Sequence, residues 1–112
     1  MLTMDVTALA AGSPARVWML EVDMEYGHAQ AFGQGEVYYH PPRRGGGPEL
    51  ESGATGGCHS EPQIIGGDLQ LWNAEEHYLA IFPDEASMRE GGRQLAAAWG
   101  DQLPAGIHRV IA

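Results

Sequence analysis

The sequence contains no lysine, and all six of its basic residues are arginines. Fifteen acidic residues oppose them, which gives a formal net charge of −9. A surface that binds nucleic acid or an anionic membrane needs a surplus of positive charge to neutralise phosphates. The charge balance therefore argues against both kinds of partner and favours a basic protein as the complement.

Cysteine and long hydrophobic runs are also scarce. Cys58 is the only cysteine, which excludes an intramolecular disulfide framework and suits a reducing compartment. No stretch approaches the roughly 18 apolar residues of a membrane helix, and the N-terminal residues lack the basic and apolar regions of a signal peptide. We expect a cytoplasmic protein.

Sequence motifs of catalysis are missing as well. The chain has no nucleophile-elbow, zinc-protease, phosphate-loop or dinucleotide-binding pattern. We therefore expect a protein that is not an enzyme, with no catalytic residues and no cofactor.

What the sequence has in excess is glycine, with sixteen among 112 residues, about twice the ordinary usage. Glycine and proline make up almost half of residues 41–62, where Leu50 is the only large aliphatic side chain. Irregular segments longer than about 12 to 15 residues are usually functional or disordered. We expect one domain, residues 1–112, with a long irregular loop at 41–62 that is either an adaptable recognition loop or a flexible insertion.

The pattern of apolar residues predicts several strands. From Val17 to Tyr26 apolar and polar residues alternate, which is typical of a half-buried strand. Trp18 and Leu20 fall on the face expected to be buried. Residues 3–10 fit either a strand or a short helix, and the strand is favoured. Other segments expected to form strands are 28–40, with bulges near its glycines, 62–72, 77–82 and 106–112, and residues 68–82 are expected to form a hairpin.

Residues 83–100 predict a helix. Pro83, Asp84 and Glu85 supply a capping residue and early negative charge, and Gly100 supplies a stop. The interior pair Gly91–Gly92 indicates close approach of the helix to the sheet. The expected fold is α+β, a mostly antiparallel sheet with this helix packed on it and the 41–62 loop between middle strands.

Candidate contact residues come from the strand, the loop and one aromatic side chain. The acidic residues that alternate along the first strand are expected on its solvated face, where they would meet a basic partner. Among the three tryptophans, which are otherwise expected in the core, the one beside a polar turn is expected to be a partly exposed anchor. The proposed partner-binding residues are Glu21, Asp23, Glu25, Arg43, Arg44, Glu49, Glu51 and Trp72.

A second hypothesis is a small metal-binding protein or enzyme. Cysteine and histidine are suitable ligands for transition metals, and the residues that could gather at the base of the loop are His40, Cys58, His59 and Glu61. The spacing matches no standard metal motif. Another alternative is a structural subunit that acts through self-association, with a homodimer as its simplest form.

The segment 36–72 contains "YYHPP", a Gly/Pro-rich stretch and "EPQII". In this order it resembles a loop of small uncharacterised proteins of tailed phages and prophages. The resemblance covers about a third of the chain and implies no catalytic residue. It implies a genetic setting in which small acidic proteins bind and block host machinery, as anti-defence or toxin-immunity proteins do. The leading hypothesis is an inhibitor of a basic protein, such as a nucleic-acid enzyme or a toxin.

Overall fold

The computed structural model describes residues 3–23, 28–52, 57–65, 69–73 and 77–99 of the chain. Within these ranges the backbone alone is described for residues 22–23, 28–32, 63–65, 77 and 95–99.

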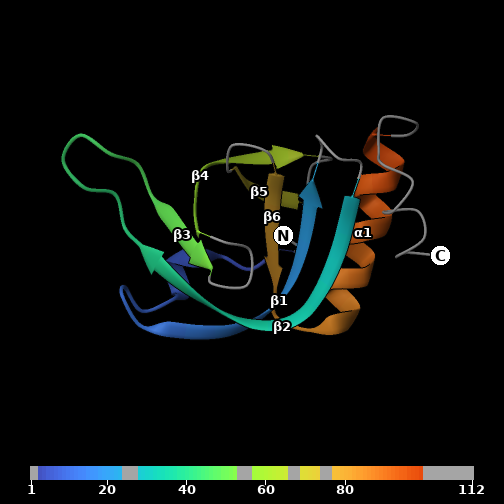
Figure 1. Cartoon of the computed structure of the whole chain (residues 1–112), viewed down its shortest axis with the longest axis horizontal. Helices are drawn as coiled ribbons and strands as arrows, with labels where there is room; N and C mark the ends of the chain where they lie inside the picture. The colour runs from blue at the N-terminus through green and yellow to red at the C-terminus, as the bar shows by residue number, and fades with distance from the viewer. Residues whose placement is uncertain (1–2, 24–27, 53–56, 66–68, 74–76, 100–112) are drawn as a thin grey trace.

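The described elements are six strands, a short 3₁₀ helix and an α-helix (Figure 1). Each strand pairs antiparallel with the next, and the last strand pairs antiparallel with the first, so the sheet closes into a barrel. The elements are η1 (Val6–Ala8), β1 (Pro14–Asp23), β2 (His28–His40), β3 (Glu49–Ser52), β4 (Gly57–Ile65), β5 (Leu69–Asn73), β6 (His77–Phe82) and α1 (Glu85–Trp99).

The expected fold class, an α+β sheet interrupted by an irregular loop at 41–62, is wrong. Nearly half of that segment belongs to β3 and β4, which connect β2 to β5 around the barrel. Gly45, Gly46 and Gly47 lie in the connection between β2 and β3, where Gly45 adopts a φ of 83° that side chains rarely allow. The glycines at this place therefore mark a tight turn, and the closed sheet makes the fold mostly β.

The interior of the barrel is an apolar cluster to which five strands and η1 contribute. Trp72 is its largest side chain and is 1% exposed. Polar groups enter it on β3 and β4: the Ser52 hydroxyl donates to Sδ of Met19 at 3.6 Å, and His59 is fully buried opposite Leu50. The apolar members are Val6, Val17, Met19, Val37, Tyr39, Leu50, Trp72, Leu79 and Ile81.

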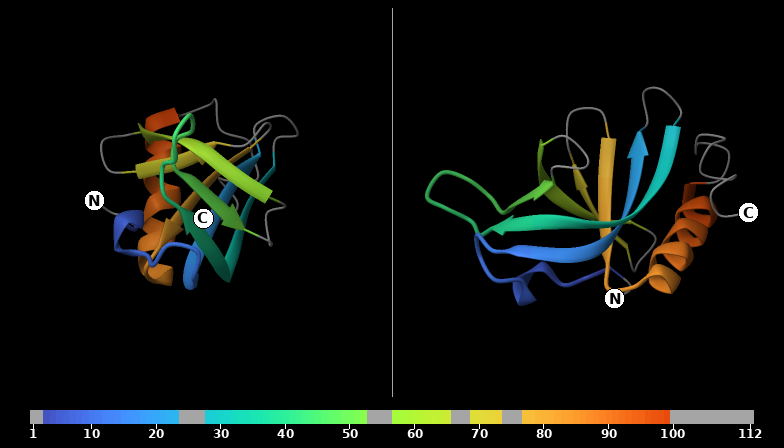
Figure 2. Two further views of the ribbon diagram at one scale, coloured as in Figure 1. Left: turned by 90° about the vertical axis from the view of Figure 1, so that its left-hand side faces the viewer. Right: turned by 60° about the horizontal axis from the view of Figure 1, so that its bottom comes forward.

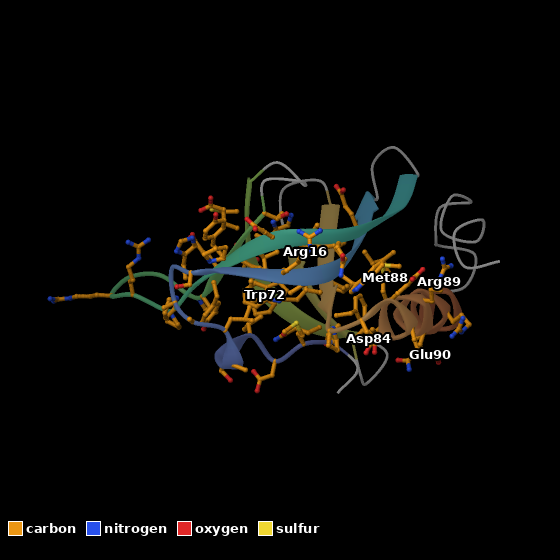
Figure 3. The ribbon with its side chains drawn as sticks, turned by 90° about the horizontal axis from the view of Figure 1, so that it is seen from below. Arg16, Trp72, Asp84, Met88, Arg89 and Glu90 are labelled. Carbon is orange, nitrogen blue, oxygen red and sulfur yellow. The ribbon has the colours of Figure 1, made fainter. Side chains whose placement is uncertain are left out.

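A second apolar layer lies outside the barrel, where α1 packs against β1, β5 and β6. Leu20 of β1 and Phe82 of β6 are buried there, together with Met88 of α1. Figure 3 shows Met88 on the barrel side of α1, whereas Arg89 and Glu90 lie away from the barrel. Strand β1 is therefore buried on both faces, through Val17 and Met19 toward the interior and Leu20 toward α1.

The N-terminal segment lies across one end of the barrel (Figure 2). The amide of Met4 donates to the Ile81 carbonyl at 2.9 Å, and the amide of Gly12 donates to the Tyr39 carbonyl at 3.1 Å. Val6 of η1 is buried in the interior cluster. The strand favoured for 3–10 is wrong, and the alternative of a short helix is nearer to the structure, because a 3₁₀ helix capped by Asp5 places Val6 over the barrel end.

The predicted helix is confirmed and spans Glu85–Trp99. Oδ1 of Asp84 accepts from the Ser87 amide at 2.8 Å, and this hydrogen bond lowers the pKa of the Asp84 carboxyl. The 68–82 hairpin is also confirmed, as β5 and β6, and β2 ends at His40 directly before Pro41–Pro42. The strand expected at 106–112 and the stop at Gly100 lie outside the described residues.

The close approach predicted from the glycine pair is confirmed at Gly91. A Cβ atom added at Gly91 would lie 2.5 Å from two ring atoms of Phe82 and 3.3 Å from Cδ2 of Leu69. Phe82 is fully buried. The absence of a side chain at Gly91 therefore allows the backbone of α1 to pack directly against the ring of Phe82.

We expect Gly91→Ala to destabilise the protein. Overpacking a core costs about 1–3 kcal/mol, which exceeds the roughly 1 kcal/mol that alanine contributes over glycine inside a helix. Chemical denaturation should show a net loss near 1 kcal/mol, whereas Gly47→Ala, which faces open space, should change stability by less than about 0.5 kcal/mol.

The same substitution placed in a Phe82→Leu background isolates the cause. With the ring removed, Gly91→Ala should become neutral or stabilising. An equal loss in both backgrounds would show that contact with Phe82 is not the reason for the glycine.

Candidate functional site

A polar surface covers the outer side of β2, β3 and β4, away from α1 (Figure 1). Val37 and Tyr39 face the interior, so Glu36, Tyr38 and His40 alternate onto the outside of β2. The register continues this face across the next two strands. We call it the outer β2–β4 face and define it as Glu36, Tyr38, His40, Glu49, Glu51 and Cys58.

An ion pair lies where β2 and β3 leave the barrel. Nε2 of His40 is 3.1 Å from Oε1 of Glu51, and the two side chains are 34% and 48% exposed. A pair this exposed contributes little stability. Its effect is to place an imidazole and a carboxylate side by side on the outer β2–β4 face.

Cys58 lies beside the same carboxylates. Its thiol is exposed, and β4 places it opposite Glu51. Partial burial raises its pKa, and the charges of Glu49 and Glu51 together with a hydrogen bond to Glu49 raise it further. The thiolate is the nucleophilic form of cysteine, so this environment opposes nucleophilic chemistry at Cys58.

The connection between β2 and β3 projects from the barrel on the side opposite α1 (Figures 1 and 2). It ends in a tight turn in which Arg43 and Gly46 exchange two backbone hydrogen bonds of 3.2 and 2.9 Å. We call residues 41–47 the hairpin tip. Beside it is an open hollow of about 310 Å³ lined by His40, Pro41, Arg43, Arg44, Gly45, Gly46, Gly47 and Glu49.

Four of the predicted contact residues come together at this place. Arg43 and Arg44 are exposed in the hairpin tip, and Glu49 and Glu51 lie on the adjoining strand. Neither arginine forms an ion pair with the described residues. The tip therefore presents positive charge directly beside a negative strand.

Glu21, the first residue of the acidic row predicted on β1, is placed differently. It is opposite Leu79, which is fully buried inside the barrel, so Glu21 lies on the inner face and not on a solvated outer face. The reason is that α1 covers the other face of β1, which reverses the expected sides. Glu21 is half-buried, Asp23 ends the strand, and Glu25 lies outside the described residues.

The tryptophan predicted as an exposed anchor is also placed differently. Trp72 is 1% exposed and belongs to the interior cluster (Figure 3), so the anchor prediction is wrong. Trp18, expected in the core, is half-buried on the outer side of β1, and one of its ring carbons would contact a Cβ at Gly33 at 3.7 Å. In the closed barrel Trp72 is therefore buried and Trp18 is partly exposed, the reverse of what was expected.

Sequence reasoning missed Tyr38 and Glu36 as surface candidates. The signal was present in "EVYYH", where Val37 and Tyr39 alternate with polar or amphipathic neighbours. Tyr38 is half-buried and Glu36 is exposed. Tyrosine in such a position is typical of protein-binding surfaces.

The metal ligands suggested by the sequence are not brought together. His40 and Cys58 lie on the outer β2–β4 face, whereas His59, next to Cys58 on the same strand, faces the interior. Glu61 is exposed at a bulge of β4. Among side chains that the structure describes, no group of three or more His, Cys, Asp or Glu could hold a metal.

Comparison with protein families gives no matching family model, and comparison with curated proteins and with solved structures gives no significant match. Within the described residues no helix is long and apolar enough to cross a membrane.

We expect Cys58 to react slowly with iodoacetamide at neutral pH. The half-maximal rate should lie above pH 8.5, the value near which an unperturbed thiol titrates. Glu49→Gln combined with Glu51→Gln should lower that midpoint, because two of the charges that oppose the thiolate are removed.

The matched control carries Glu85→Gln and Glu90→Gln on α1, which change the net charge by the same amount. This control should leave the midpoint unchanged. A midpoint at or below pH 8.5 in the unmodified protein would contradict the assigned environment.

Proposed function

We propose that the protein is a non-enzymatic binding protein that inhibits a basic protein partner. The observation that supports this proposal most directly is that the outer β2–β4 face adjoins the projecting hairpin tip. Carboxylates, a half-buried tyrosine and two exposed arginines there form one continuous surface beside an open hollow. Interfaces of this composition, with tyrosine and arginine among charged groups, suit recognition of another protein.

The distribution of charge favours this surface over the helix. On α1, Arg89 pairs with Glu85 at 3.0 Å, and Arg93 pairs with Glu90 at 2.7 Å, so much of the helix charge is balanced locally. On the outer β2–β4 face Glu36, Glu49 and Glu51 form no ion pair with a described arginine. A net charge of −9 would accelerate encounter with a basic partner, and the local carboxylates would fix its orientation.

The two arginines of the hairpin tip have a different role in this proposal. Positive side chains at the end of a projecting hairpin would meet acidic groups of the partner, while Glu49 and Glu51 meet its basic groups. A surface with both signs of charge in a fixed order discriminates among partners better than a uniformly negative one. Arginine is suited to this contact because its planar fork binds carboxylates with two hydrogen bonds.

The biological setting we propose is a phage or prophage, in which the partner is a defence protein or a toxin of the host cytoplasm. Support comes from the sequence resemblance of residues 36–72 and from the acidic composition. Blocking such a partner requires only stable occupation of its basic surface. No catalytic residue of this chain takes part.

The proposal is tested first by affinity capture from host lysate at low and high salt, followed by measurement of Kd with the purified partner. Glu49→Gln combined with Glu51→Gln should weaken binding about tenfold, since two interfacial charges together contribute on the order of 1.4 kcal/mol. The loss should shrink at high salt, where exposed charges are screened within about 8–10 Å.

The control again carries Glu85→Gln and Glu90→Gln, which alter net charge equally but lie on α1. Its Kd should stay within about twofold of the original. Equal weakening by both variants would reduce the effect to net charge and remove the outer β2–β4 face from the proposal. Recovery of this chain alone, with self-association in sedimentation experiments, would favour a structural subunit.

A further inference from the structure

The arginines of the hairpin tip and those of α1 differ in their neighbours. On α1, Arg89 and Arg93 each pair with a glutamate one turn away, at 3.0 and 2.7 Å. Arg43 and Arg44 of the tip are exposed and form no ion pair with a described residue. The nearest carboxylate along the chain, that of Glu49, belongs to a residue that lines the same hollow as both of them. Opposite charges therefore lie close together at this hairpin without neutralising one another.

The hairpin separates the two signs of charge along its length. Arg43 and Gly46 exchange two backbone hydrogen bonds, so Arg44 and Gly45 occupy the two outermost positions of the turn. Glu49 is the first residue of β3, at the base of the projection, and Glu51 lies two residues nearer the barrel. The surface thus has a positive end and a negative base.

Two glycines of the hairpin tip have no neighbour in the described part of the chain that requires them. A Cβ atom added at Gly46 or Gly47 would have no described atom within 4 Å, and neither residue has a positive φ. Gly91 is different, because its missing side chain makes room for the ring of Phe82. The open hollow of about 310 Å³ lies beside the same backbone. The tip therefore has room for another molecule to approach its backbone closely.

We propose that the molecule that occupies this space is a second copy of the chain, whose hairpin packs against the first in a symmetric dimer. In a two-fold arrangement each contact occurs twice, because the same patch of both copies takes part. The arginines of each tip would lie against Glu49 and Glu51 of the other copy, and each tip would enter the other copy's hollow. One surface carries the projection and the hollow, the cations and the carboxylates, so it is complementary to itself.

The residues between the two charged zones suit the centre of such a contact. Pro41 and Pro42 are exposed, Pro48 is half-buried, and none of them carries a charge. Proline has almost no side-chain entropy to lose on burial. Arginine binds carboxylates through two parallel hydrogen bonds. Uncharged residues at the centre with charged residues around them are typical of protein interfaces.

The net charge of −9 on each copy opposes association over a long range. At moderate ionic strength exposed charges farther apart than about 8–10 Å are largely screened, whereas partly buried contact pairs are screened less. Repulsion between whole chains is therefore reduced by salt before the attraction at the hairpins is lost. We expect a weak dimer that forms best at moderate salt and dissociates at both very low and high salt.

This inference concerns the surface of the proposed function but does not rest on that function, because dimerisation is measured on the isolated chain. A dimer of this kind covers the hairpin tip and its carboxylates, so a basic partner would have to displace the second copy. Self-association together with capture of a partner fits both proposals. Self-association without any captured partner leaves the dimer alone, and capture of a partner by a strictly monomeric chain leaves the binding function alone.

The test is charge reversal followed by mixing, read by sedimentation equilibrium of untagged protein at moderate salt. The unsubstituted chain should shift from monomer to dimer as its concentration rises. Arg43→Glu combined with Arg44→Glu, and separately Glu49→Arg combined with Glu51→Arg, should each weaken dimerisation at least tenfold, because like charges then face one another. An equal mixture of the two variants should dimerise again, since both contacts of the mixed dimer join opposite charges. Both variants remain acidic, because each double substitution changes the net charge of −9 by only four.

The matched control is Arg89→Glu combined with Arg93→Glu, which changes the net charge as the tip variant does but lies on α1, on the other side of the barrel (Figure 1). Its dimerisation should stay within about twofold of the original. In case a variant fails to fold, hydrogen exchange of the unsubstituted protein at low and high concentration should show protection of residues 41–49 and none of α1. The proposal is overturned if the unsubstituted chain stays monomeric at concentrations up to about 1 mM, which corresponds to roughly 4 kcal/mol of binding free energy. It is equally overturned if either reversed variant dimerises as before, if the mixture does not dimerise, or if the protection lies outside the hairpin.

Discussion

The hydrogen-bonded pairing of β6 with β1 is the constraint on which the rest of the structure depends. It runs from Trp18 opposite Phe82 to Asp23 opposite His77 and closes the sheet. A closed sheet has an inside that must be filled, and here Trp72 and the aliphatic side chains around it fill it. Closure also gives β1 two buried faces, because α1 packs on its outer side.

The bulge of β2 is the second constraint, and it depends on Gly33. This residue has a φ of 76°, a conformation that few other residues adopt readily. The extra residue shifts the register of β2 against β1, so that Met19 pairs with Gly33 and Leu20 with Ala31. The two strands thereby stay paired on both sides of the bulge.

Local features of the fold were predictable from the sequence, and distant ones were not. The cap at Asp84 and the close approach of α1 to the sheet at Gly91 were predictable, because each depends on residue types within a few positions of one another. The partner of Gly91, Phe82, was not predicted. The sequence did not predict that Leu50 and Ser52 belong to a strand. Strand β3 has only four residues, and these two side chains are buried by residues far away in the sequence. Trp72 and Trp18 exchanged expected roles for the same reason: alternation identifies two faces, but only closure decides which one is inside.

Strand β2 also links the interior of the barrel to the surface to which we assign a function. Its last residues alternate, with Val37 and Tyr39 in the interior cluster and Glu36, Tyr38 and His40 on the outer β2–β4 face. Because close packing holds the interior side chains in place, it also sets the orientation of the outer side chains and of the hairpin tip that follows them. The proposed recognition surface therefore depends on closure of the barrel, since closure decides which side chains of β2 are inside and which are outside.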